Sequence, residues 1–90
     1  MNKKRFEEIM GDDNGGKSLT DLNDDNACIG LQIIRKYCPT KGIEGADHDI
    51  IYSVDPDELV EAGITEEDAI RLRDINWMID SESGCMACFV

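Results

Sequence analysis

Asp55-Pro-Asp-Glu-Leu-Val-Glu-Ala-Gly-Ile-Thr-Glu-Glu-Asp-Ala69 is the stretch with the clearest local signals in this chain of 90 residues. Asp55 is a favourable N-cap, and Pro56 suits the first position of a helix. The side chain of Glu58 is placed to reach back to the backbone N–H of the cap, as in a capping box. These residues predict a short helix over 56–62.

The residues after this helix predict a second one, so that the two form a helical hairpin. Gly63 supplies the left-handed position that commonly ends a helix. Thr65 caps the next helix, which we predict over 66–79. The first turn of that helix carries three carboxylates that complement its positive end, namely Glu66, Glu67 and Asp68.

Two other segments have the composition of strands. Residues 49–54 are rich in β-branched and aromatic side chains, and residues 85–90 carry no charge and must be buried or paired. An apolar arc predicts a further helix over 27–38, ended by Pro39. The sequence therefore predicts an α+β domain in which a two-stranded sheet of 49–54 and 85–90, in either direction, is packed by helices 27–38, 56–62 and 66–79. The expected core is Leu31, Ile34, Ile51, Leu59, Leu72, Trp77, Ile79 and Phe89.

The first third of the chain divides differently. Residues 1–26 predict a short helix over 3–10, with Phe6, Ile9 and Met10 on one side, and a flexible loop rich in Gly, Asp and Asn. Residues 27–90 form the predicted compact acidic domain. A rival interpretation joins residues 19–37 into one helix, although an Asp/Asn cluster would then lie inside it.

The charge is distributed unevenly along the chain. It holds 20 acidic and 9 basic residues, for a net charge of −11. Residues 1–46 contain eight acidic and seven basic residues, whereas residues 47–82 contain twelve acidic residues and only Arg71 and Arg73 as basic ones. This balance excludes direct binding to nucleic-acid phosphates and to anionic membrane surfaces.

The acidic stretch, residues 47–82, contains the predicted hairpin. Carboxylates held on a rigid frame can occupy Arg and Lys sites that otherwise meet phosphates, with fast and salt-sensitive association. We therefore predict a non-catalytic module that docks on a protein partner with a basic surface, such as a nucleic-acid-binding protein. The predicted partner-binding residues are Asp55, Asp57, Glu58, Glu61, Glu66, Glu67 and Asp68.

Four cysteines and one histidine allow two other interpretations. Cys85-x-x-Cys88 has the spacing of zinc ligands, and Cys28, Cys38 or His48 would complete a tetrahedral site. Cysteines that simply pack as small apolar side chains are the simpler prediction, with no cofactor. An enzyme would use His48 as a general base between its two neighbouring aspartates, but no nucleophile can be assigned to it.

The predicted hairpin resembles a known motif. Gly63-Ile-Thr-Glu-Glu-Asp-Ala69 resembles the turn of a helix-hairpin-helix motif (a SAM-like hairpin) across residues 55–79. The second glycine of that family, whose amide meets phosphate, is Thr65 here, and the flanking positions, often basic in the family, are acidic. The resemblance therefore implies the shape of the hairpin without its phosphate binding.

A second resemblance covers residues 27–90. It is carried by Gly45-Ala-Asp-His-Asp-Ile-Ile-Tyr52, Glu58-Leu-Val-Glu-Ala-Gly-Ile-Thr65 and Asn76-Trp-Met-Ile79. These segments are similar to small uncharacterised acidic proteins encoded in bacterial genomes and prophages. The similarity implies an origin in a phage or another mobile element and no known activity.

The apolar segments of the chain are too short for a membrane protein. The longest apolar run, residues 85–90, is far shorter than the roughly 20 residues of a membrane span. No leader-like apolar segment follows the basic residues near the start. We expect a cytoplasmic protein with reduced cysteines, in which the strand 85–90 pairs either within the chain or across a homodimer.

Overall fold

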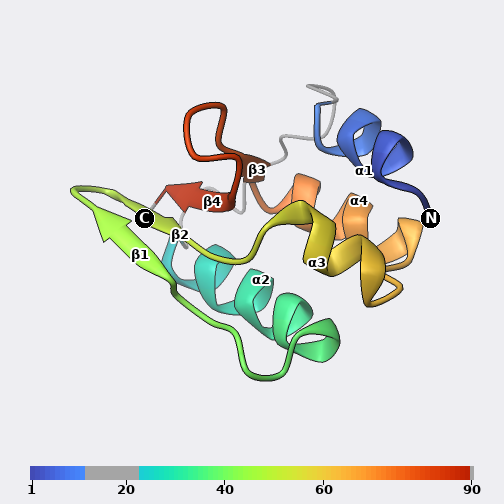
Figure 1. Cartoon of the computed structure of the whole chain (residues 1–90). Coiled ribbons are helices and arrows are strands. Elements are labelled where there is room, and N and C mark those ends of the chain that lie inside the picture. The colour runs from blue at the N-terminus through green and yellow to red at the C-terminus, as the bar shows by residue number, and fades with distance from the viewer. Residues whose placement is uncertain (12–22, 90) are drawn as a thin grey trace.

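The structure is a computed structural model that describes residues 1–11 and 23–89 (Figure 1). Along these residues, pairs of helices alternate with pairs of strands: α1 (Lys3–Met10), α2 (Asn23–Tyr37), β1 (Gly45–Asp47), β2 (Ile50–Tyr52), α3 (Pro56–Glu61), α4 (Glu66–Asp74), β3 (Trp77–Ile79) and β4 (Met86–Phe89). The α+β class is as predicted, but the sheet is not.

The sheet has four antiparallel strands in the order β1-β2-β4-β3, whereas we predicted two strands. β4 lies between β2 and β3, with Cys88 opposite both Ile51 and Trp77. The predicted pairing of the segments 49–54 and 85–90 is therefore present as β2 and β4, and its direction is antiparallel. The two additional strands, β1 and β3, extend the sheet on either side.

β3 replaces the end of the helix that we predicted over 66–79. The helix α4 ends at Asp74, and Asn76 adopts a left-handed backbone conformation with φ of 68°. Asparagine is one of the few residues besides glycine that tolerates this conformation. The chain therefore turns at Asn76, and Trp77 begins a strand that alternates sides.

β1 lies between the helix predicted over 27–38 and the strand predicted over 49–54, in a segment to which we assigned neither helix nor strand. Gly45, Ala46 and Asp47 have little strand propensity of their own, but they pair with β2 through a two-residue turn. His48 occupies this turn with φ of 51°. The pairing with β2 therefore determines the conformation of β1.

The helix α2 starts earlier than predicted, at Asn23 instead of residue 27, and ends at Tyr37. Asn26 therefore lies inside the helix. The rival helix over 19–37 has residues 19–22 outside the described part of the chain. Gly30 lets α2 approach the sheet closely, because a Cβ at this position would lie 1.8 Å from Nε1 of Trp77.

The buried side chains form one cluster that includes α1. Phe6, Ile9 and Met10 of α1 are buried, as their placement on one side of the predicted helix implies. Figure 1 shows α1 beside α3 and α4 at the β3 end of the sheet, while α2 packs against β3 and β4. The flexible loop predicted after α1 falls on residues outside the described ranges.

Five of the eight predicted core residues are buried: Ile34, Ile51, Leu59, Leu72 and Trp77. Leu31 and Ile79 are only partly buried, and Phe89 is 57% exposed. Phe89 follows Cys88 on β4, so the alternation of the strand turns it to the opposite face of the sheet.

The capping signals of the hairpin are confirmed. Glu58 accepts a hydrogen bond from the N–H of Asp55 at 3.2 Å, and Thr65 Oγ1 accepts one from the N–H of Asp68 at 3.1 Å. Gly63 has φ of 90°, and the N–H of Ile64 bonds to the carbonyl of Leu59, as in a Schellman motif. Across the described residues, the helices are all too short or too polar to cross a membrane.

Candidate docking surface

The predicted partner-binding carboxylates lie together on the α3–α4 hairpin. Asp55 precedes α3, and the other six are distributed over α3 and the first turn of α4. Five of the seven residues are exposed, and Glu58 and Asp68 are partly buried. The fold therefore presents these carboxylates on two well-capped helices, as the sequence predicts, but it also supplies cations to several of them.

Two of these cations come from α1. Lys3 Nζ lies 2.9 Å from Oδ1 of Asp57. Nε and Nη2 of Arg5 both donate to Oε1 of Glu66, at 3.1 and 2.9 Å. Each hydrogen bond raises the pKa of the basic group, first through the bond itself and then through the charge of the carboxylate. The basic residues near the start of the chain therefore neutralise part of the hairpin.

Helix α2 and the segment after it contribute two more cations. Lys36 Nζ lies 2.9 Å from Oδ2 of Asp68, and the hydroxyl of Tyr37 donates to the same oxygen. The Tyr37 hydrogen bond is the main reason that the pKa of Asp68 lies below its ordinary value, and Lys36 lowers it further. Lys41 Nζ lies 3.8 Å from Oε1 of Glu58.

Three of the seven carboxylates have no ion pair among the described residues: Asp55, Glu61 and Glu67. Asp55 accepts a long hydrogen bond, 3.6 Å, from the thiol of Cys85. Glu61 and Glu67 are exposed on α3 and α4. The bare negative charge of the hairpin is therefore concentrated at these positions.

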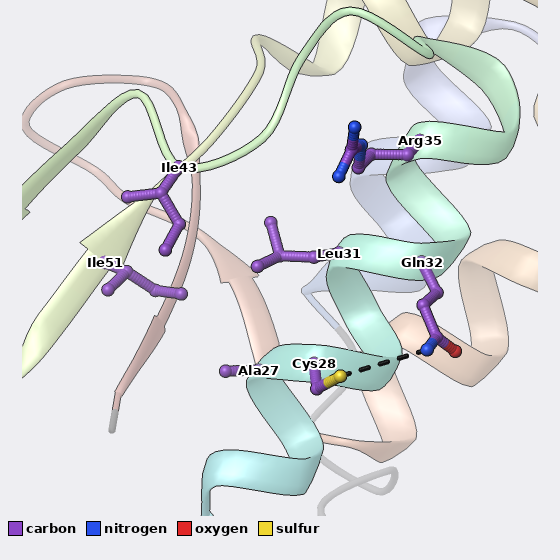
Figure 2. Close-up of a pocket in the computed structure, with 7 residues that line it drawn as sticks. All are labelled: Ala27, Cys28, Leu31, Gln32, Arg35, Ile43 and Ile51. Atoms are coloured by element: carbon purple, nitrogen blue, oxygen red, sulfur yellow. Dashed lines mark hydrogen bonds between the residues drawn. The ribbon is translucent and has the colours of Figure 1, made fainter.

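A second surface feature is an apolar groove between α2 and the region of β1 and β2 (Figure 2). Its volume is about 580 Å³, and its lining residues are Ala27, Cys28, Leu31, Gln32, Arg35, Ile43 and Ile51. In Figure 2, Ile43 and Ile51 face Leu31 and Ala27 across the groove, and Arg35 stands at one end. The residues that line the groove belong to other elements than the hairpin carboxylates, which lie on α3 and α4.

The residues of the alternative zinc site are spread over the fold. Cys28 is exposed on α2, Cys38 follows that helix, and Cys85 and Cys88 lie before and within β4. Burial raises the pKa of the Cys88 thiol to about 11, which keeps it protonated at neutral pH. The described residues contain no group of three or more Cys, His, Asp or Glu side chains that could hold a metal ion.

His48, the candidate general base, projects from the β1–β2 turn. Its side chain is 91% exposed, and Nε2 lies 3.6 Å from Oδ1 of Asp47. The imidazole therefore has the carboxylate of the last residue of β1 beside it. This placement is that of an exposed surface residue in a tight turn.

Sequence reasoning missed the internal cations and the groove. Arg5 and Glu66 are 61 positions apart, so no local pattern could pair them. The groove brings residues of α2 together with Ile43 and Ile51, which are distant from them in the sequence, so no local pattern could reveal it. The near-neutral balance of residues 1–46 was the one available signal, since it left basic groups free to pair elsewhere.

Comparison of the chain with known proteins finds no matching family model, no matching curated protein and no matching solved structure.

Proposed function

We propose that the protein is a non-catalytic binding module that docks its acidic α3–α4 hairpin on a basic surface of a partner protein. The observation that supports this most directly is the placement of seven carboxylates on two helices whose ends are fixed by caps. A basic surface that otherwise meets nucleic acid fits this geometry best, because it is already built to receive closely spaced anions. A phage or mobile-element origin is part of the same proposal.

The internal ion pairs are compatible with docking. Lys3, Arg5 and Lys41 pair with their carboxylates at the surface. Ion pairs of this kind contribute little to folding stability, so a partner's arginine can replace or share them at small cost. The partner would then meet Glu61 and Glu67 first, because no cation competes for them within the described part of the chain.

The role of Asp68 differs from that of the other six residues. Its side chain is 17% exposed and holds Lys36 and Tyr37, which join α2 to the start of α4. We assign it to holding the hairpin in place and not to direct contact with the partner. The docking residues of this proposal are Asp55, Asp57, Glu58, Glu61, Glu66 and Glu67.

The test compares two double variants that change the net charge equally. Glu61→Lys/Glu67→Lys reverses charge on the hairpin without breaking an internal ion pair. Asp49→Lys/Glu82→Lys is the matched control, because both residues are exposed and lie outside the hairpin. Proteins captured on the wild type are identified by mass spectrometry, and the dissociation constant of the enriched basic partner is measured for each variant.

The expected result is a loss of affinity of about tenfold or more for the hairpin variant at low salt, with little change for the control. The affinity of the wild type should also decrease as the salt concentration is raised from about 0.01 M to about 1 M, because the Debye length shrinks from about 30 Å to about 3 Å over that range. Equal effects of the two variants, an affinity indifferent to salt, or capture without any basic protein would each contradict the proposal.

A further inference from the structure

The apolar groove of Figure 2 has a composition that differs from the rest of the surface. The chain is strongly acidic, yet none of the seven lining residues carries a carboxylate. Docking through the hairpin does not use this groove, so a ligand of the groove is independent of the proposed protein partner.

The walls of the groove are branched aliphatic side chains that the fold leaves partly uncovered. Leu31 was expected in the core, but it is only partly buried on α2, and its side chain points into the groove in Figure 2. Ile43 is 56% exposed, which makes it one of two large apolar side chains with that degree of exposure among the described residues. Ile51 forms the floor from β2. Covering these surfaces would be favourable for any ligand with an alkyl chain.

One end of the groove is basic. Arg35 lies one turn of α2 after Leu31 and has no ion pair or hydrogen bond from its side chain within the described ranges. Among the other basic residues of the described ranges, five have carboxylate partners, namely Lys3, Arg5, Lys36, Lys41 and Arg73, whereas Lys4 and Arg71 have none and lie outside the groove. An unpaired guanidinium beside an apolar wall, in a chain with 20 acidic residues, is the feature that identifies the ligand.

We propose that the groove binds a small aliphatic carboxylate, with the alkyl chain along Leu31, Ile43 and Ile51 and the carboxylate at Arg35. The planar guanidinium of arginine matches a carboxylate through two parallel hydrogen bonds. The volume of about 580 Å³ lies within the range of small-molecule sites. A cationic amphiphile would meet Arg35 unfavourably, and a phosphate without an alkyl chain would leave the apolar walls uncovered.

The first experiment titrates hexanoate, octanoate and decanoate, below their micelle concentrations, into the ¹⁵N-labelled protein. Backbone amide shifts should move in α2 and at Ile43 and Ile51. Each pair of added methylenes should raise affinity about tenfold until the groove is filled. 1-Decanol, which has a similar chain and no charge, should bind at least about fivefold more weakly than decanoate, because it gains no charge-assisted hydrogen bond.

Variants separate the two parts of the site. Arg35→Gln should weaken decanoate about tenfold and leave 1-decanol unchanged, whereas Ile43→Ser should weaken both ligands. Arg71→Gln is the matched control, because Arg71 is also exposed but lies on α4, away from the groove. The proposal is overturned by equal binding of decanoate and 1-decanol, by an equal loss in the control, by shifts that map outside the groove, or by no binding at millimolar decanoate.

Discussion

Replacing Gly30 by alanine should destabilise the protein, although alanine is the better helix former. In an exposed helix, this change favours the folded state by roughly 1 kcal/mol. At Gly30 the new Cβ would lie 1.8 Å from Nε1 and 2.2 Å from Cε2 of Trp77. The indole ring is buried, so either the ring or α2 must move.

The magnitude of the loss depends on the contacts that this movement disrupts. Trp77 Nε1 donates a hydrogen bond of 2.9 Å to the carbonyl of Asn26, and leaving a buried donor without its partner costs about 1–3 kcal/mol. Forcing an extra carbon into a packed interior costs about 1–3 kcal/mol more. After the gain of roughly 1 kcal/mol in helix propensity, we expect a net loss of about 1–5 kcal/mol. The total stability of a chain of this length is about 5–13 kcal/mol.

Urea unfolding measures this loss directly. Trp77 is the only tryptophan of the chain, so its fluorescence reports from the site of the clash, while circular dichroism follows the helices. Gly42→Ala is the control, because a Cβ there has no atom within 4 Å, and it should be neutral or stabilising by up to about 1 kcal/mol. A Gly30→Ala variant as stable as the wild type, with unchanged Trp77 fluorescence, would refute the close packing of α2 on Trp77.

Two further predictions concern titrating groups. The pKa of Asp68 is lowered in the folded state, mainly by the hydrogen bond from Tyr37. Its contribution to folding stability is therefore complete above its unfolded pKa of about 4 and is lost as the pH falls through the lower folded value. In urea unfolding, Asp68→Asn should cost about 1–2 kcal/mol near neutral pH and reduce the loss of stability in acid, whereas Glu67→Gln should do neither. The pKa of Cys88 is raised to about 11, so the folded state retains a proton that the unfolded chain releases above about pH 8.5, and stability should fall progressively from there towards pH 11. Cys88→Ala should reduce this alkaline loss, and thiol labelling at neutral pH should modify Cys28 long before Cys88; a Cys88 that reacts as fast as Cys28 would contradict its burial.

The parts of the fold that sequence predicted well are those specified by neighbouring residues. The caps at Asp55 and Thr65 and the turn at Gly63 depend on contacts within a few positions, so the hairpin α3–α4 could be located closely. The end of α4, in contrast, could not be located from the sequence. Residues 77–79 could continue the apolar face of the helix that contains Leu72, and they could equally form a strand. Only the left-handed backbone conformation of Asn76 excludes the continued helix.

Long-range pairing accounts for the errors in both the sheet and the candidate site. β1 is a strand because β2 lies beside it, and its own residues carry no strand signal. In the same way, Lys3 and Arg5 reach the hairpin only because α1 packs against α3 and α4. The acidic residues of the hairpin were predictable from the sequence, whereas the subset left without a cation was not.

The position of β4 affects how the sheet can be assembled during protein synthesis. β2 and β3 do not pair with each other and are connected only through β4, which is the last of the described elements to leave the ribosome. Until then, the β1–β2 hairpin is a two-stranded unit of marginal stability, and β3 has an unpaired edge on the side that β4 will occupy. A nascent or truncated chain without residues 86–89 therefore exposes two strand edges, which are templates for aggregation and targets for chaperones.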